Sequence, residues 1–106
     1  MSQPLFGLID DAGANVMILM DGLHAEDLRR SRVTRQEVKR QLLNMADSLG
    51  KLQSSLQQQL PELDWDAWST IVRHLHSDHL EDDALWFAAS ALTPATLMWL
   101  RVYRER

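Results

Sequence analysis

The longest helical stretch in this chain is TRQEVKRQLLNMADSLGKLQSSLQQQL, residues 34–60. Thr34 and Glu37 have the spacing of a capping box at its start, and Pro61 directly follows its end. We therefore expect one helix over residues 34–60, roughly 40 Å long at about 1.5 Å per residue. Gly50 lies inside it and either marks a close approach between helices or is merely tolerated. Its apolar residues recur at heptad-like intervals of three and four, so they share one stripe: Val38, Leu42, Met45, Leu49, Leu52 and Leu56.

Helical spacing also dominates the N-terminal third of the chain. Leu5, Ile9 and Val16 lie on one stripe that continues to Leu23, and Gly22 is a stop signal near the end of that helix. Residues 24–31 can form a second, short helix.

Two more helices are expected after Pro61. Asp64 can cap a fourth helix, whose apolar stripe runs over residues 65–75. Residues 81–83 give a fifth helix an acidic first turn, and Pro94 kinks or breaks it. Because each connection is short, neighbouring helices should pack antiparallel. The predicted fold is therefore all-α, an up-and-down bundle of four to five helices.

Composition narrows the class of protein. A chain of 106 residues with 45% apolar and 25% charged residues is typical of one soluble domain, here residues 1–106. It has no cysteine, which excludes disulfides, thiolate metal sites and a cysteine nucleophile. No run reaches the length of a membrane span, and aspartates flank the apolar stretch at 16–20, unlike a signal peptide. We expect a cytoplasmic protein with no membrane partner.

Charges are unevenly distributed along the chain. The net charge is −4, which argues against a protein that coats nucleic acid, yet nine of the eleven basic residues are arginine, the side chain that grips phosphates. Basic residues crowd into positions 29–40, and acidic residues crowd into positions 62–83 around a single cation, Arg73. These two charged stretches have two possible interpretations. They are helix faces exposed to solvent, or they are surfaces for self-association or for binding a charged partner.

The most unusual motif is RHLHSDH, residues 73–79, which holds three of the four histidines. One interpretation is a metal site using His76, Asp78 and His79, although no cysteine or distant Glu-x-x-His completes a ligand set. A second is phosphodiester chemistry, because histidine moves protons near neutral pH and arginine stabilises charge on a phosphate. A third is structural, since histidines at a helix end interact favourably with the helix dipole and nearby acids.

Taken together, several segments resemble the HepT-like toxins of the HEPN family, small all-α proteins encoded beside an MNT-type nucleotidyltransferase antitoxin. The similarity covers nearly the whole chain. It is carried by the order and spacing of LIDD at 8–11, LHAEDL at 23–28, TRQEV at 34–38, PELDW at 61–65 and DALW at 83–86, with Pro94 eight residues further on. The family motif is Arg, four to six residues, then His, and Arg73 and His79 satisfy it with five residues between them.

This resemblance implies a metal-independent endoribonuclease without a cofactor, acting as a homodimer with the motif in a cleft between protomers. His79 would act as general base or acid, and Arg73 would stabilise the transition state. His74 occupies a position that is commonly polar in the family. Asp47, on the facing long helix, would orient Arg73 or a histidine.

The chain departs from the family pattern in two places. The stretch between Trp65 and Trp86 is shorter than usual, so His76 is an alternative to His79 as the motif histidine. Many members also carry a tyrosine two residues after the histidine, where the antitoxin transfers AMP, and this chain has Glu81 there. The alternative function is therefore a non-catalytic HEPN-type module that partners a nucleotidyltransferase or binds a nucleotide.

Overall fold

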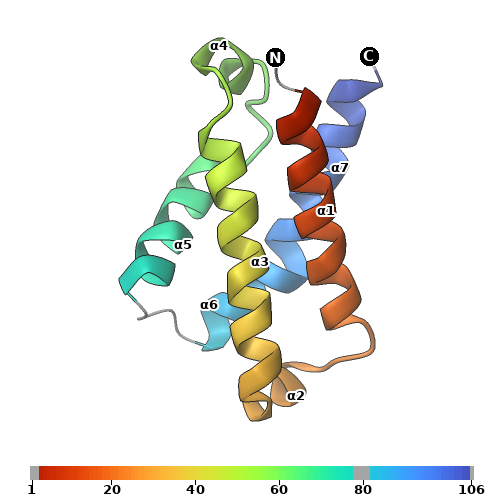
Figure 1. Ribbon diagram of the computed structural model, residues 1–106, viewed down its shortest axis with the longest axis vertical. Helices are drawn as coiled ribbons and strands as arrows, with labels where there is room; N and C mark the ends of the chain where they lie inside the picture. The colour runs from red at the N-terminus through yellow and green to blue at the C-terminus, as the bar shows by residue number, and fades with distance from the viewer. Residues whose placement is uncertain (1–2, 78–81, 106) are drawn as a thin grey trace.

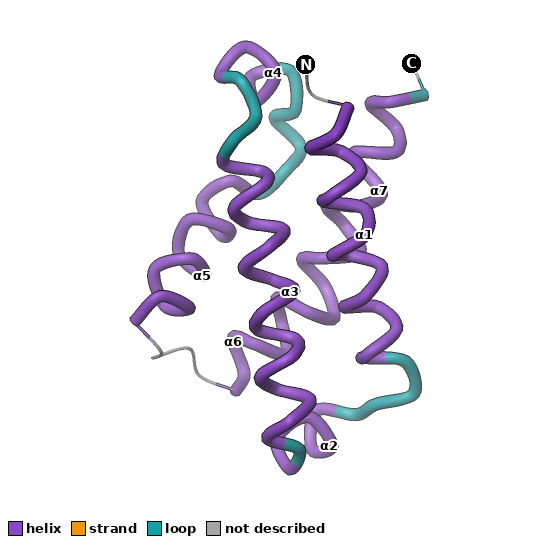
Figure 2. The backbone as a smooth tube through the Cα atoms, in the orientation of Figure 1, coloured by secondary structure: helices purple, strands orange, loops and turns teal. Residues whose placement is uncertain are grey.

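The computed structural model describes residues 3–77 and 82–105, and every regular element within these ranges is helical. The predicted all-α class is thus confirmed (Figure 2). In chain order the elements are α1 (Gln3–Met20), α2 (Ala25–Arg30), α3 (Arg32–Gly50), α4 (Ser54–Gln58), α5 (Trp65–Ser77), α6 (Asp82–Phe87), the π-helical turn η1 (Ala88–Leu92) and α7 (Thr93–Arg104).

The longer helices alternate in direction (Figure 1). In that view α1 descends, α3 ascends through the middle of the molecule, α5 descends beside it, and α7 ascends to end near the N-terminus. α3 contacts α1, α2, α5 and η1, and α1 also packs against α7. α3 is therefore the element that joins the α1–α7 side of the molecule to α5.

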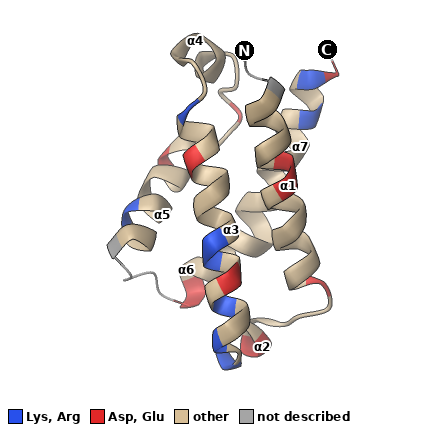
Figure 3. Cartoon of the chain, in the orientation of Figure 1, with Lys and Arg blue, Asp and Glu red and all other residues tan. Residues whose placement is uncertain are grey.

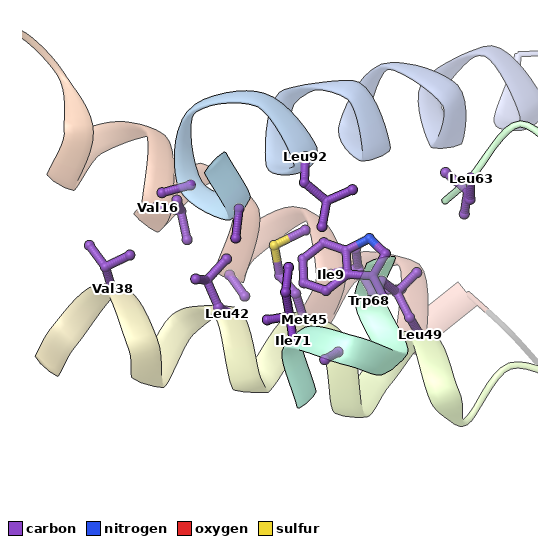
Figure 4. Packing of buried hydrophobic residues seen from close by; sticks show 14 of the residues in the cluster. Ile9, Val16, Val38, Leu42, Met45, Leu49, Leu63, Trp68, Ile71 and Leu92 are labelled. Carbon is purple, nitrogen blue, oxygen red and sulfur yellow. The ribbon is translucent and has the colours of Figure 1, made fainter. Parts of the chain in front are cut away.

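The core lies along the predicted stripe of α3. Val38, Leu42, Met45 and Leu49 are fully buried and meet the buried residues of α1 and of the C-terminal helices (Figure 4). One buried polar pair ties α5 to α7, because the Trp68 indole Nε1 donates to the Thr96 hydroxyl over 3.0 Å. The apolar periodicity thus correctly identified the buried face of this helix.

The long helix is shorter than predicted. α3 ends at Gly50, and the separate helix α4 follows from Ser54, so the expectation of one helix over residues 34–60 is wrong. Because the helix breaks here, the chain folds back and buries Leu52 and Leu60 in the core. In a straight helix both residues would lie beyond the end of the core. The Gln57 amide then donates to the carbonyls of Leu49 and Leu52, which ties α4 to the end of α3.

The start of α3 also differs from the prediction. Ser31, not Thr34, is the N-cap, and its hydroxyl accepts a hydrogen bond from the Thr34 backbone N–H. Glu37 does not reach back to the helix start; it binds Arg40 and Gln41 instead. Both Ser31 and Thr34 are good cap residues, and the cap at Ser31 adds a turn to the helix.

The predicted helix stop at Gly22 and the predicted helix cap at Asp64 are both present in the structure. Gly22 adopts φ +74° in the turn after α1, a conformation that suits glycine. The Asp64 carboxylate accepts from the Ala67 N–H and caps α5. At Pro94 the structure shows a wide π-helical turn followed directly by α7, rather than a break. The wider turn makes room for the proline ring, and both the N–H and the hydroxyl of Thr93 donate to the Ala88 carbonyl.

Candidate functional site

The motif arginine lies on the exposed side of α5. Arg73, His74 and His76 are all exposed, in the last two turns of the helix. Arg73 and His76 are three residues apart and therefore share a helix face. His79, the other candidate motif histidine, lies outside the described residues, as do Asp78 and Glu81. The described part of the motif thus places one arginine and one histidine on the same side of α5.

A hollow of about 510 Å³ between α3 and α5 brings two of the predicted site residues together. Asp47 contributes from α3 and Arg73 from α5. Neither hydrogen bond nor ion pair links the two side chains in the described parts of the chain, so each presents its charge to the hollow. We call this the Arg73 hollow.

The wall of the Arg73 hollow is apolar. Trp65, Trp68 and Val72 of α5 line it opposite Leu49 of α3. Both indoles are anchored: Trp68 by Thr96, and Trp65 by a bond of 3.0 Å from its Nε1 to the Leu60 carbonyl. Trp68 is buried, while Trp65 is half-buried and packs against the core. The hollow therefore combines a rigid apolar wall with a charged rim.

A second hollow, also of about 510 Å³, lies further towards the N-terminal end of α3. Four cations line it, Arg32, Arg35, Lys39 and Arg40, together with Gln36 and the leucines at 43 and 75. We call it the basic groove. Lysine and arginine residues, blue in Figure 3, cluster on the N-terminal half of α3. The sequence drew attention to the basic strip at 29–40 but did not show that part of it is concave and reaches α5.

The strip divides into two parts with different surroundings. Arg29 faces acidic residues: it pairs with Glu26 at 3.3 Å and approaches Asp83 at 3.6 Å and Asp82 at 3.9 Å. Some of the segregated charge is thus compensated within the chain. Arg35 instead donates to the backbone carbonyls of Arg29 and Leu28, which orients its guanidinium without neutralising it.

One ion pair flanks the basic groove. Arg40 donates to both carboxylate oxygens of Glu37, at 3.1 and 2.6 Å. This contact, with a further bond from Gln41, lowers the pKa of Glu37 from 4.5 to about 2 and raises the pKa of Arg40. Gln41 is buried and also accepts from Asn15 of α1. The pair therefore fixes Arg40 at the edge of the groove through a network that reaches α1.

Within residues 3–77 and 82–105, no group of three His, Asp or Glu side chains is placed to hold a metal ion. The metal-site interpretation of the motif also depended on Asp78 and His79, which lie outside these ranges. None of the helices described is long and apolar enough to cross a bilayer.

Comparison with known proteins returned no relatives. No family profile matches the chain, and neither a curated protein sequence nor a solved structure matches it significantly.

Proposed function

We propose that this protein is a HepT-like toxin, a metal-independent endoribonuclease that acts in the cytoplasm as a homodimer. The observation that supports the proposal most is the Arg73 hollow, in which Asp47 from α3 and Arg73 from α5 line the same cavity. The two residues are 26 positions apart: the motif points to Arg73, and the family resemblance points to Asp47. Their position in one hollow supports the proposal that they act together.

In the proposed mechanism a histidine removes the proton from a ribose 2′-hydroxyl. The 2′-oxygen then attacks the adjacent phosphorus, the bond from phosphorus to the 5′-oxygen breaks, and an acid returns a proton to that leaving oxygen. Arg73 stabilises the extra negative charge on the phosphate during attack. Asp47 acts as a positioning residue for Arg73. The motif histidine is His79 or His76, and His74 is a further polar group beside Arg73.

Exposure of the motif supports the dimer in this proposal. Arg73 and His76 are open to solvent in the single chain, whereas charge stabilisation is strongest where water is excluded. One histidine per chain also supplies one of the two proton transfers that the reaction needs. A cleft between two protomers would exclude water and bring two Arg–His pairs together.

Cleavage of RNA in excess EDTA tests the proposal. The purified protein should degrade a single-stranded RNA without added metal, and alanine at the motif histidine should lower the rate by about 10²–10⁴-fold, the usual contribution of a general acid or base. Comparing His76→Ala with His79→Ala identifies that histidine, and His74→Ala should retain more activity than the variant at the motif histidine. The proposal would be refuted by a well-folded dimer that leaves RNA intact and does not arrest growth on expression.

The same variants separate the enzyme from a non-catalytic binding module. In the enzyme, growth arrest disappears with Arg73→Ala and with the motif-histidine variant. In a binding module these substitutions change nothing, while substitutions in the 29–40 strip break the complex with a nucleotidyltransferase partner. The antitoxin in this proposal is an MNT-type nucleotidyltransferase, and Glu81 in place of the usual tyrosine means that it neutralises this toxin by another route than AMP transfer at that position.

A further inference from the structure

The two hollows share one face of α3. Residues of α3 from both hollows follow one another at helical intervals of three and four, so they form a single stripe: Arg32, Arg35, Lys39 and Leu43 line the basic groove, and Ala46 and Gly50 line the Arg73 hollow. α5 contributes a matching stripe, with Trp65, Trp68 and Val72 at one end and Leu75 at the other. The two hollows therefore lie one after the other along the side of α3 that faces α5, and we refer to them together as the trough.

The trough concentrates positive charge in an acidic protein. Its described lining includes six of the eleven Lys and Arg residues of the chain and one of the fifteen Asp and Glu residues, Asp47. In the basic groove, Arg35 is oriented by two backbone carbonyls that leave its charge uncompensated. Glu37, which pairs with Arg40, is not among the described lining residues. Among the described residues, the lining of the trough thus carries more basic than acidic side chains, in contrast to the net charge of −4.

These features favour a phosphodiester strand as the occupant. Arginine guanidinium groups bind phosphate oxygens in a fork, and three arginines line the basic groove. The Arg73 hollow adds an apolar wall containing Trp65, which suits the faces of unstacked bases. Bases present these faces in a single strand, whereas a duplex keeps them stacked. From Arg32 to Gly50 the α3 face is roughly 27 Å long at about 1.5 Å per residue, enough for several nucleotides.

We propose that the basic groove is a binding subsite for the backbone of single-stranded nucleic acid, continuous with the Arg73 hollow along α3. The role of this subsite as a substrate track rests on the proposed ribonuclease function. Binding itself does not, because a strand without 2′-hydroxyls occupies the same cations but offers no nucleophile for the proposed reaction. Binding and cleavage are therefore measured separately.

The test is fluorescence anisotropy with a labelled oligodeoxythymidine about twelve nucleotides long, within the range that single-strand binding sites cover. The full chain, Arg32→Gln and the matched control Arg101→Gln are compared between about 50 and 200 mM salt. Arg32 and Arg101 are both exposed, and Arg101 lies on α7, outside the trough. Loss of one phosphate contact should weaken binding about three- to tenfold and reduce the salt slope by about 0.7, while the control should match the wild type.

Three results would overturn the inference. The first is no binding by the wild type, and the second is equal weakening by Arg32→Gln and Arg101→Gln. The third is tight binding of polyglutamate with none of the oligonucleotide, which would assign the groove to an acidic protein partner. If only the ribonuclease proposal is wrong, binding of the oligonucleotide still depends on Arg32, but RNA is not cleaved. Conversely, RNA cleavage that depends on Arg73 with no Arg32-dependent binding would retain the enzyme and reject the subsite.

Discussion

Two faces of α3 differ sharply in burial and in charge. One face, with Val38, Leu42 and Met45, is inaccessible to solvent and packs into the core. A neighbouring face carries Arg32 and Asp47, both exposed, and lines the trough against α5. One helix thus supplies both the core of the fold and the cationic surface of the candidate site. Substitutions on the two faces should therefore have separable effects, on stability for one and on binding or catalysis for the other.

The strongest test of this contrast is Leu42→Ala on the buried face. Leu42 has no exposed surface, so truncation removes buried methyl groups and leaves a cavity, at a cost of about 3 kcal/mol in the free energy of unfolding. Urea denaturation measures it. Gln36→Ala, on the trough face, should stay within about 0.5 kcal/mol of the wild type. Equal losses in the two variants would contradict the division of α3 into two faces.

A second test concerns the anchor behind the Arg73 hollow. Thr96→Val keeps the shape of the side chain but leaves the buried indole N–H of Trp68 without its acceptor. The free energy of unfolding should fall by about 1–3 kcal/mol. Thr70→Val, on the exposed side of α5, is the matched control and should change little. If Thr96→Val were as stable as this control in thermal or urea unfolding, the anchor would be unimportant.

The smallest effect is expected where the two faces meet, at Glu37. Its pKa falls from 4.5 to about 2 in the folded chain because Arg40 and Gln41 bond to its carboxylate. A lowered pKa stabilises the fold above about pH 4.5, and that contribution disappears as the pH drops towards 2. The melting temperature of Glu37→Gln should therefore lie below that of the wild type at pH 7, and the difference should vanish over this window. A difference that did not change with pH would refute the role of this ion pair.

Local patterns predicted the fold well where a short stretch of sequence carries the cause. The stripe from Val38 to Leu49 marks a buried face because periodicity reports which side of a helix faces the core. Asp64 caps α5 through its own side chain. The same periodicity failed beyond Gly50, where Leu52 keeps the helical spacing but is buried by a chain that turns back. That turn depends on packing between segments, which spacing does not contain.

The candidate site was harder to predict from the sequence than the fold was. Arg73 stands out within the RHLHSDH motif, but only the family resemblance points to Asp47, and no spacing argument places residues of two different helices in one hollow. The basic groove carried a detectable signal, because cations at 32, 35 and 39 repeat at the helical interval. Its concave shape comes from the approach of α5, with Leu75 as the opposite wall. A helix-face analysis of the basic strip would have found the cations but not the groove.

The most direct measurement of the central proposal is the cleavage rate of a single-stranded RNA in EDTA by the wild type, Arg73→Ala and Arg101→Ala. The account predicts that Arg73→Ala loses about 10²–10³-fold in rate, the usual effect of removing a group that stabilises transition-state charge, with unchanged thermal stability. Arg101→Ala, which removes a cation outside the trough, should cleave like the wild type. Equal rates for all three proteins, or no cleavage by a folded wild type, would contradict it.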